Sequence, residues 1–152
     1  IDLKNKTALI LGGGGVVPSI IEGLNKLLIQ KIFLMNRTFE KIEKFKEKYT
    51  KVELLKWGES VEFDIIINAT SIGLKINDEI SINLSNLKGS KIFYDTIYNP
   101  PMTNFLKKAK QNGHKIVNGK NMLVFQAQKS FECWNNLKPI VNEKFFKFLN
   151  ND

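Results

Sequence analysis

The sequence predicts an α/β protein with a doubly wound parallel sheet of six strands, helices on both faces of the sheet, and further helices at its C-terminal end. Short runs of Ile, Val, Leu and Phe alternate along the chain with segments of helical spacing. Strands that are buried on both faces form such continuous apolar runs. Four consecutive glycines, residues 12–15, follow the first apolar run. They indicate a turn at which the backbone is bare and a ligand approaches it closely.

The expected elements alternate in order along the chain. The pattern predicts strands near residues 6–11, 31–35, 52–56, 63–67, 91–95 and 114–117. Helical spacing is found in most of the connections, at residues 16–28, 24–30, 41–51 and 103–111. The tail from Gly119 to Leu149 predicts two helices separated near residues 137–139. No internal repeat, low-complexity tract or linker interrupts the 152 residues, so we expect one domain.

The glycine run lies between the first expected strand and the first expected helix. A helix N-terminus offers unpaired N–H groups and a positive dipole end, and glycine lets phosphate oxygens reach them. Gly12 and Gly14 fill the first two glycine positions of the Rossmann dinucleotide-binding fingerprint, whereas Val17 stands at the third. Pro18 suits a first helical turn. We therefore expect a Rossmann-like fold with a pyrophosphate at this turn; a glycine-rich turn without a ligand is the alternative.

The second expected strand ends in Asn36, Arg37 and Thr38. A site for NAD places Asp or Glu here to bind the ribose 2′-hydroxyl, whereas an arginine and a hydroxyl suit a 2′-phosphate. Lys41, one helical turn later, adds a second cation. The favoured cofactor is therefore NADP. Two alternatives stay open: Arg37 as an ordinary surface residue, and Thr38 as the N-cap of the next helix.

Later loops end at the same edge of the sheet, because the carboxyl ends of parallel strands lie together. The small polar segment 68–73 follows the fourth strand and can pass along the nicotinamide half of the cofactor. Residues 94–101 follow the fifth strand, and residues 118–122 open a helix. We expect these loops to converge with the glycine turn on one site.

Composition excludes several classes of function. The formal net charge is +8, but the lysines are scattered, and the densest run alternates with Glu43 and Glu47 as solvated ion pairs on a helix do. We expect no nucleic-acid binding, because no arginine cluster or aromatic-interleaved basic patch occurs. We expect a soluble, cytoplasmic protein that binds no membrane, because long apolar runs and a signal-peptide layout are absent. Cys133, the single cysteine, excludes an internal disulfide and is expected to be buried, and no metal site is expected.

These motifs, in this order, resemble shikimate dehydrogenase. The resemblance rests on the glycine turn, Asn-Arg-Thr at 36–38, Asn-Ala-Thr-Ser at 68–71, Tyr-Asp-Thr-Ile-Tyr-Asn-Pro at 94–100, and the segment from Asn118 to Trp134. It covers nearly the whole chain. The family reduces 3-dehydroshikimate to shikimate with NADPH in aromatic amino-acid biosynthesis. The resemblance therefore implies an oxidoreductase of the shikimate pathway, with residues 1–152 as its NADP-binding domain.

The resemblance also implies a role for each motif residue. The implied cofactor-binding residues are Gly12, Gly13, Gly14, Gly15 and Val16 at the pyrophosphate; Asn36, Arg37, Thr38 and Lys41 at the adenosine 2′-phosphate; and Thr96, Gly119 and Met122 beside the nicotinamide. Thr70 and Ser71 are expected at the nicotinamide half of the cofactor from their place in the loop after the fourth strand. The implied substrate-binding residues are Tyr98 and Gln126. The chain departs from the family at Gly13, often an alanine there, and at Val17-Pro18, where Ala-Arg is common. The second departure removes a cation near the phosphates.

No residue of the chain is predicted to be catalytic. Reduction of a ketone needs a proton donor within hydrogen-bond reach of the carbonyl oxygen. The resemblance places the family's catalytic Lys and Asp in an amino-terminal substrate domain, which we expect to be absent because the chain begins at Ile1. His114, the one histidine, opens an expected inner strand far from the site edge and is interpreted as a surface residue. The lack of a Tyr-x-x-x-Lys pair disfavours the short-chain dehydrogenases.

Two other interpretations stay open. A quinate/shikimate dehydrogenase is the first, although its frequent use of NAD fits poorly with the Asn-Arg-Thr run. A non-catalytic nucleotide-binding module is the second. It would keep the glycine turn and leave Tyr98 as a packed loop aromatic and Gln126 as a helix surface amide. The expected partners are a small-molecule substrate, shikimate or 3-dehydroshikimate, and the missing substrate domain.

Overall fold

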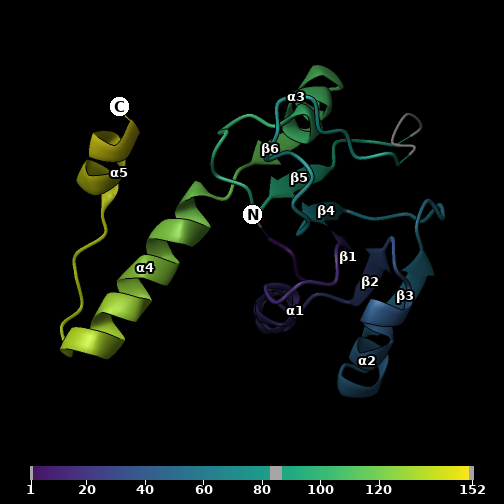
Figure 1. Ribbon diagram of the computed structural model, residues 1–152, viewed down its shortest axis with the longest axis horizontal. Coiled ribbons are helices and arrows are strands. Elements are labelled where there is room, and N and C mark those ends of the chain that lie inside the picture. Colours follow the sequence, from purple (N-terminus) through teal and green to yellow (C-terminus); the bar gives the residue numbers. More distant parts are fainter. Residues whose placement is uncertain (1, 83–86, 151–152) are drawn as a thin grey trace.

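Six parallel strands form one sheet in the computed structural model, which describes residues 2–82 and 87–150 (Figure 1). The order across the sheet is β3-β2-β1-β4-β5-β6. This is the doubly wound order in which the chain reverses direction across the sheet between β1 and β4. The strands are β1 (Thr7–Leu11), β2 (Lys31–Asn36), β3 (Val52–Lys56), β4 (Ile65–Asn68), β5 (Ile92–Asp95) and β6 (Lys115–Val117). The predicted fold class is confirmed, and every predicted strand is present within two residues of its expected bounds.

The sheet is buried on both faces because successive side chains of each strand point to opposite sides. In β1, Ala8 and Ile10 join one hydrophobic cluster, whereas Leu9 and Leu11 join another. The first cluster includes residues of α1 (Val17–Lys26) and α2 (Glu40–Lys48), and the second includes residues of α3 (Asn104–Gln111). The helices therefore cover opposite faces of the sheet, as the apolar runs predict.

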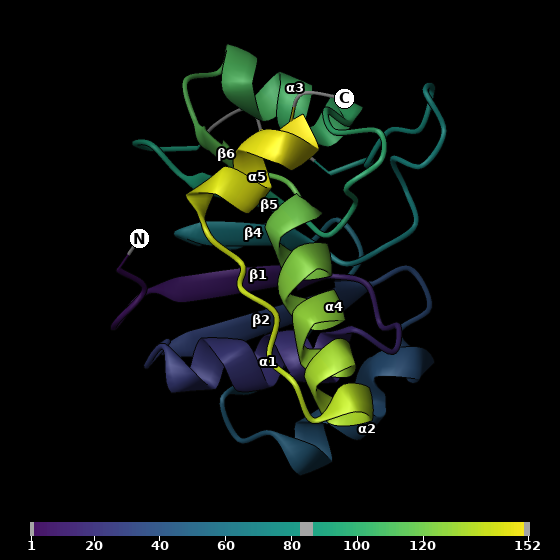
Figure 2. The same ribbon diagram turned by 90° about the vertical axis from the view of Figure 1, so that its left-hand side faces the viewer.

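Two further helices, α4 (Lys120–Asn135) and α5 (Glu143–Asn150), follow β6. In Figure 1 they stand away from the sheet, and Figure 2 shows them in front of it, on the same side as α1. Val124 is the one buried residue of α4. The two predicted C-terminal helices are thus present, with a connection at residues 136–142, and they pack loosely on the rest of the molecule.

The first helix ends earlier than its apolar spacing predicts. Its last residue is Lys26, and residues 27–30 form a turn rather than the expected helical segment 24–30. Leu28 has a left-handed backbone (φ 58), and the N–H of Ile29 donates to the carbonyl of Leu24 at 3.1 Å. This hydrogen bond belongs to a Schellman motif, which ends a helix. The motif usually carries glycine at the left-handed position, so a leucine there gave no signal in the sequence.

Two single-residue expectations are also wrong. Cys133 is exposed on α4 rather than buried, because so little of that helix packs on other elements. His114 precedes β6, which is an edge strand and not an inner one. Its ring is half-buried and stacks on Phe93 with centroids 5.0 Å apart.

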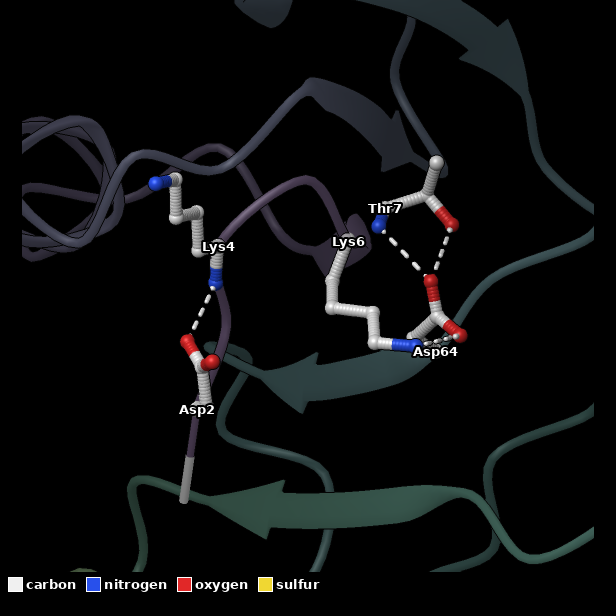
Figure 3. Close-up of polar contacts among 5 residues, drawn as sticks. All are labelled: Asp2, Lys4, Lys6, Thr7 and Asp64. Carbon is white, nitrogen blue, oxygen red and sulfur yellow. Dashed lines mark hydrogen bonds and ion pairs between the residues drawn. The ribbon is translucent and has the colours of Figure 1, made fainter.

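The amino edge of the sheet is held by a carboxylate. Asp64, just before β4, accepts hydrogen bonds from the backbone N–H of Thr7 at 2.9 Å and from its hydroxyl at 3.1 Å. The ammonium group of Lys6 lies 3.7 Å from the other oxygen of Asp64 (Figure 3). These contacts tie the starts of β1 and β4 together at the edge away from the glycine turn.

Candidate functional site

Loops after β1, β2, β3 and β4 enclose a cavity of about 310 Å³ at the carboxyl edge of the sheet. The predicted site residues that line it are Gly12, Gly13, Gly14, Asn36, Arg37, Thr38, Lys41, Thr70 and Ser71. Trp57, Ala69 and Ile72 line it as well. A volume of this size lies near the lower end of the usual range for small-molecule sites. The cavity therefore accommodates part of a dinucleotide rather than all of it.

Gly12 is the position at which the turn admits no side chain. Its backbone is left-handed (φ +116), and a Cβ there would lie 2.6 Å from the carbonyl oxygen of Ala69. Its N–H donates to the carbonyl of Met35 at 2.8 Å. The turn is thus held between the end of β2 and the loop after β4. By contrast, a Cβ at Gly14 or Gly15 would meet nothing within 4 Å, so these two glycines border open space.

The glycine turn leads into an uncapped helix. At the start of α1, Val16 makes no side-chain capping bond, and the first turn contains no acidic residue. The N–H groups of Gly15 and Val16 have no acceptor among the described residues. Val17, at the third fingerprint position, is fully buried in the core. The start of α1 therefore combines free donors, a positive dipole end and open space, which are the requirements of an anion site.

Cations border the cavity at the start of α2. The Asn36 amide donates to the backbone carbonyl of Thr38 at 2.7 Å and fixes the turn that presents Arg37. Arg37 and Lys41 are exposed, and neither forms an ion pair within the part of the chain that the structure describes. The N-cap of α2 is Phe39 without a side-chain capping bond. The alternative in which Thr38 caps this helix is therefore wrong, and its side chain borders the cavity instead.

The loop after β4 is shaped by a buried amide. Asn68 donates to the carbonyl of Ile72 and to the carboxylate of Asp95, both at 3.0 Å. Its own oxygen accepts from the Thr70 hydroxyl at 2.7 Å and from the Thr70 N–H at 3.1 Å. The hydroxyl of Thr70 is thus engaged within the loop, whereas Ser71 is exposed at the cavity. This network holds the backbone beside Gly12 in one conformation.

Asp95, at the end of β5, is enclosed, with no solvent exposure. It accepts hydrogen bonds from Asn68, from the N–H of Ile97 at 3.0 Å, and from the Thr103 hydroxyl at 2.6 Å. Burial raises its pKa, although the three hydrogen bonds partly oppose this rise. Because Thr103 also caps α3, Asp95 joins the loops after β4 and β5 to the start of that helix. Its position is that of a loop-holding group, out of reach of a ligand.

Three residues expected along the nicotinamide, Thr96, Gly119 and Met122, lie outside the cavity, whereas Thr70 and Ser71 line it. The Thr96 hydroxyl donates to the backbone carbonyl of Asn68 at 2.9 Å. Gly119 is buried, and a Cβ there would collide with the carbonyl group of Thr96. Its N–H donates to Ile97 at 3.0 Å. Met122 follows, half-buried, in the first turn of α4. The structure thus brings Thr96 and Gly119 into contact at the continuation of the same edge.

The two expected substrate residues are both exposed and do not share a pocket. Tyr98 lines a separate, mainly apolar cavity of about 550 Å³ with residues of α4 and α5. Gln126 lies on α4, one turn after Met122, and lines neither this apolar cavity nor the cavity at the carboxyl edge. Their roles stay predictions.

Sequence reasoning missed Trp57 as a lining residue, and it expected Ala69 and Ile72 only as members of the segment 68–73. Trp57 is the first residue after β3, and the rule that ligands bind beyond the carboxyl ends of strands would have indicated it.

Elsewhere in residues 2–82 and 87–150, no group of His, Cys, Asp and Glu is arranged to hold a metal ion, and no helix is long and apolar enough to cross a membrane.

The model of the protein family described as "Shikimate / quinate 5-dehydrogenase" matches residues 1–102, which contain every loop around this cavity. The chain belongs to this family. A "Shikimate dehydrogenase (NADP(+))" of Pelagibacter ubique (strain HTCC1062) is 53% identical over 148 residues, 97% of this chain and 56% of that protein. The resemblance that the motifs indicate is thereby confirmed.

Solved structures of shikimate dehydrogenases share the fold. The crystal structure of shikimate dehydrogenase from Aquifex aeolicus has a TM-score of 0.85 and 35% identity, covering 99% of this chain and 55% of that one. A shikimate dehydrogenase in complex with NADP+ has a TM-score of 0.79 and 33% identity, covering 90% of this chain and 51% of that one. This chain spans about half the length of the curated relatives that it matches.

Proposed function

We propose that this chain binds NADP as the cofactor half of an enzyme that reduces 3-dehydroshikimate to shikimate in aromatic amino-acid biosynthesis. The observation that carries the proposal is the cavity that Arg37 and Lys41 line together with the glycine turn. The name of the relative that is 53% identical, a shikimate dehydrogenase using NADP(+), supports the same cofactor and reaction.

The residues present fit the cofactor. Gly15 and Val16 offer free N–H groups to the pyrophosphate at the open start of α1, and Gly12 lets the turn pass against Ala69. Arg37 and Lys41 supply charge for a 2′-phosphate. Among the described residues no acidic side chain lines the cavity, where one would bind a 2′-hydroxyl. When bound, the reduced cofactor supplies the hydride. The remaining predicted contacts are Thr70, Ser71, Thr96, Gly119 and Met122 toward the nicotinamide, and Tyr98 and Gln126 toward the substrate.

The proton donor for the carbonyl oxygen is proposed to come from a substrate domain outside these 152 residues. Within the described chain, Asp95 is enclosed, and His114 precedes β6, at the amino edge of the sheet. Neither group reaches the cavity at the carboxyl edge. The share of the curated relatives that this chain spans, about half, leaves room for such a domain. A reducing, cytoplasmic location fits a chain with a single cysteine.

Titration of the chain with NADPH and with NADH tests the cofactor. NADPH should bind at least ten-fold more tightly, about 1.4 kcal/mol, because a 2′-phosphate gains charge-assisted hydrogen bonds. Arg37→Ala should remove most of this difference, whereas Lys107→Ala, the same loss of charge on the distant helix α3, should leave it intact. Equal affinities for the two cofactors in the unmodified chain would sink the proposal.

A turnover assay separates the remaining alternatives. The chain alone, with shikimate and NADP, should show no rate above background, and a preparation that includes a substrate domain should reduce NADP. Quinate in place of shikimate then distinguishes a quinate/shikimate enzyme. Tight NADPH binding without turnover in the complete enzyme would favour the non-catalytic module.

A further inference from the structure

Trp57 is the one aromatic side chain among the described residues that line the cavity at the carboxyl edge. It follows β3 directly and is half-buried. Part of its indole packs against the hydrophobic cluster on the α3 side of the sheet. Its Nε1–H lies 3.5 Å from the Ser81 hydroxyl. The ring is therefore anchored in the core on one side and exposed to the cavity on the other.

The groups around the cavity follow the order of the strands. β3, β2 and β1 are neighbours in the sheet, and adjacent strands lie about 4.8 Å apart. After β1 come the glycine turn and the open helix start, after β2 comes Arg37, and after β3 comes Trp57. Moving outward from β1, the chain thus presents free N–H groups, then a cation, then an aromatic ring.

This order matches the covalent order of one half of the proposed cofactor. Its pyrophosphate is joined to a ribose that carries the 2′-phosphate, and that ribose is joined to adenine. A ligand with its pyrophosphate at the glycine turn and its 2′-phosphate at Arg37 has its purine within one ribose of Arg37. Trp57 stands on the neighbouring strand at that range. Purine rings stack on aromatic side chains, and tryptophan offers the largest such surface.

We propose that Trp57 binds the adenine ring of the cofactor by stacking, an inference that rests on the proposed NADP binding. The second tryptophan, Trp134, is a natural comparison because it is 82% exposed at the end of α4 and lines neither this cavity nor the apolar cavity beside α4 and α5. A tryptophan that served the core alone would be enclosed, as Phe93 is at 1% exposure.

The probe for the test is adenosine 2′,5′-bisphosphate, which carries the purine and the 2′-phosphate but no nicotinamide. It should quench the tryptophan fluorescence of the unmodified chain, and Trp134→Phe should leave this quenching intact. Trp57→Phe should abolish the quenching while calorimetric affinity stays within about three-fold, because phenylalanine still stacks. Trp57→Ala should weaken binding by ten-fold or more, about 1.4 kcal/mol. Thermal unfolding of each variant checks that it is folded.

Adenosine 5′-monophosphate separates the base from the 2′-phosphate. Trp57→Ala should weaken its binding by the same factor as for the bisphosphate, whereas Arg37→Ala should weaken only the bisphosphate. Binding of the bisphosphate with unchanged affinity by Trp57→Ala, or quenching that persists in Trp57→Phe, would overturn the role of Trp57 alone. No binding of either nucleotide by the folded, unmodified chain would overturn the proposed function and this inference together. The fluorescence of Trp134→Phe tests the stacking even where Trp57→Ala fails to fold.

Discussion

Two aspartates at opposite edges of the sheet make similar contacts, but their pKa values are shifted in opposite directions. At the amino edge, the side chain of Asp64 is 36% exposed. Burial pushes its pKa upward, but the hydrogen bonds from Thr7 and the charge of Lys6 outweigh burial and leave the pKa below its usual value (Figure 3). At the carboxyl edge, Asp95 also accepts several hydrogen bonds, but complete enclosure dominates and raises its pKa.

The difference shows how the two edges serve the molecule. Asp64 joins the starts of two strands and has water beside it, so its loss is partly compensated by solvent. Asp95 holds two loops and a helix start that shape the candidate site, and its partners Asn68 and Thr103 are buried as well. A polar group that fixes a functional loop from inside the protein cannot be replaced by solvent.

Replacing the two aspartates by alanine should give the largest difference in stability between the two edges. Asp95→Ala leaves the donors of Asn68, Ile97 and Thr103 without an acceptor in an enclosed site, so we expect a loss of about 4 kcal/mol in the free energy of unfolding. Asp64→Ala exposes its partners to water and should cost about 1 kcal/mol. Urea unfolding of both variants measures the difference. Equal losses would show that enclosure does not set the value of these hydrogen bonds.

Two glycines at the carboxyl edge allow a similar comparison between an enclosed position and an open one. Gly12→Ala forces a Cβ into a left-handed backbone and against the carbonyl of Ala69, so we expect a loss of about 3 kcal/mol. Gly14→Ala enters open space and should change stability by less than about 0.5 kcal/mol. Thermal unfolding of the two variants without ligand is the measurement. A stable Gly12→Ala protein would mean that the turn adapts and is not held by β2 and the loop after β4.

The smallest expected effect is a change in stability with pH, and its sign should differ between Asp64 and Asp95. The folded pKa of Asp64 is lowered, so its contribution is present above the ordinary value of 3.8 and is lost as the pH falls through the folded pKa. The folded pKa of Asp95 is raised, so its contribution is present below 3.8 and declines as the pH rises toward the folded pKa. The free energy of unfolding should be measured against pH for both variants. In Asp64→Asn it should fall less at acid pH than in the unmodified protein. In Asp95→Asn it should no longer fall as the pH rises above 3.8. The same change in both variants would contradict the opposite shifts.

Much of the fold is predictable from the sequence because the apolar runs are long enough to set the strands. The segment around Ile65 is a clear example, since continuous apolar residues have few alternatives to a buried strand. Helix ends are harder to predict. Leu28 takes a left-handed backbone conformation, which is usual for glycine and not indicated by a leucine side chain. Cys133 illustrates another limit, because burial depends on whether a helix finds a partner surface.

The site was predictable only where residues act through their own chemistry. The glycine turn and Arg37 carry signals that position in the chain makes specific, and the structure places both at one cavity. The buried contact between Asn68 and Asp95 joins residues 27 positions apart, and no local pattern reveals such a pair. Trp57 stands at a strand end, where ligands bind, but an aromatic residue there has the same composition signal as a core residue, so its residue type does not distinguish the two roles.

Amide hydrogen exchange at the open start of α1 should report on ligand binding. Without acceptors, the amides of Gly15 and Val16 rely on water, and hydrogen exchange there should follow the fraying of the first helical turn. An oxyanion that accepts from these groups would take the part that a capping side chain plays in other helices. Exchange should then slow at this one turn while the amide of Leu24 stays as it was. Part of the affinity for the ligand would thus appear as rigidity of a helix end.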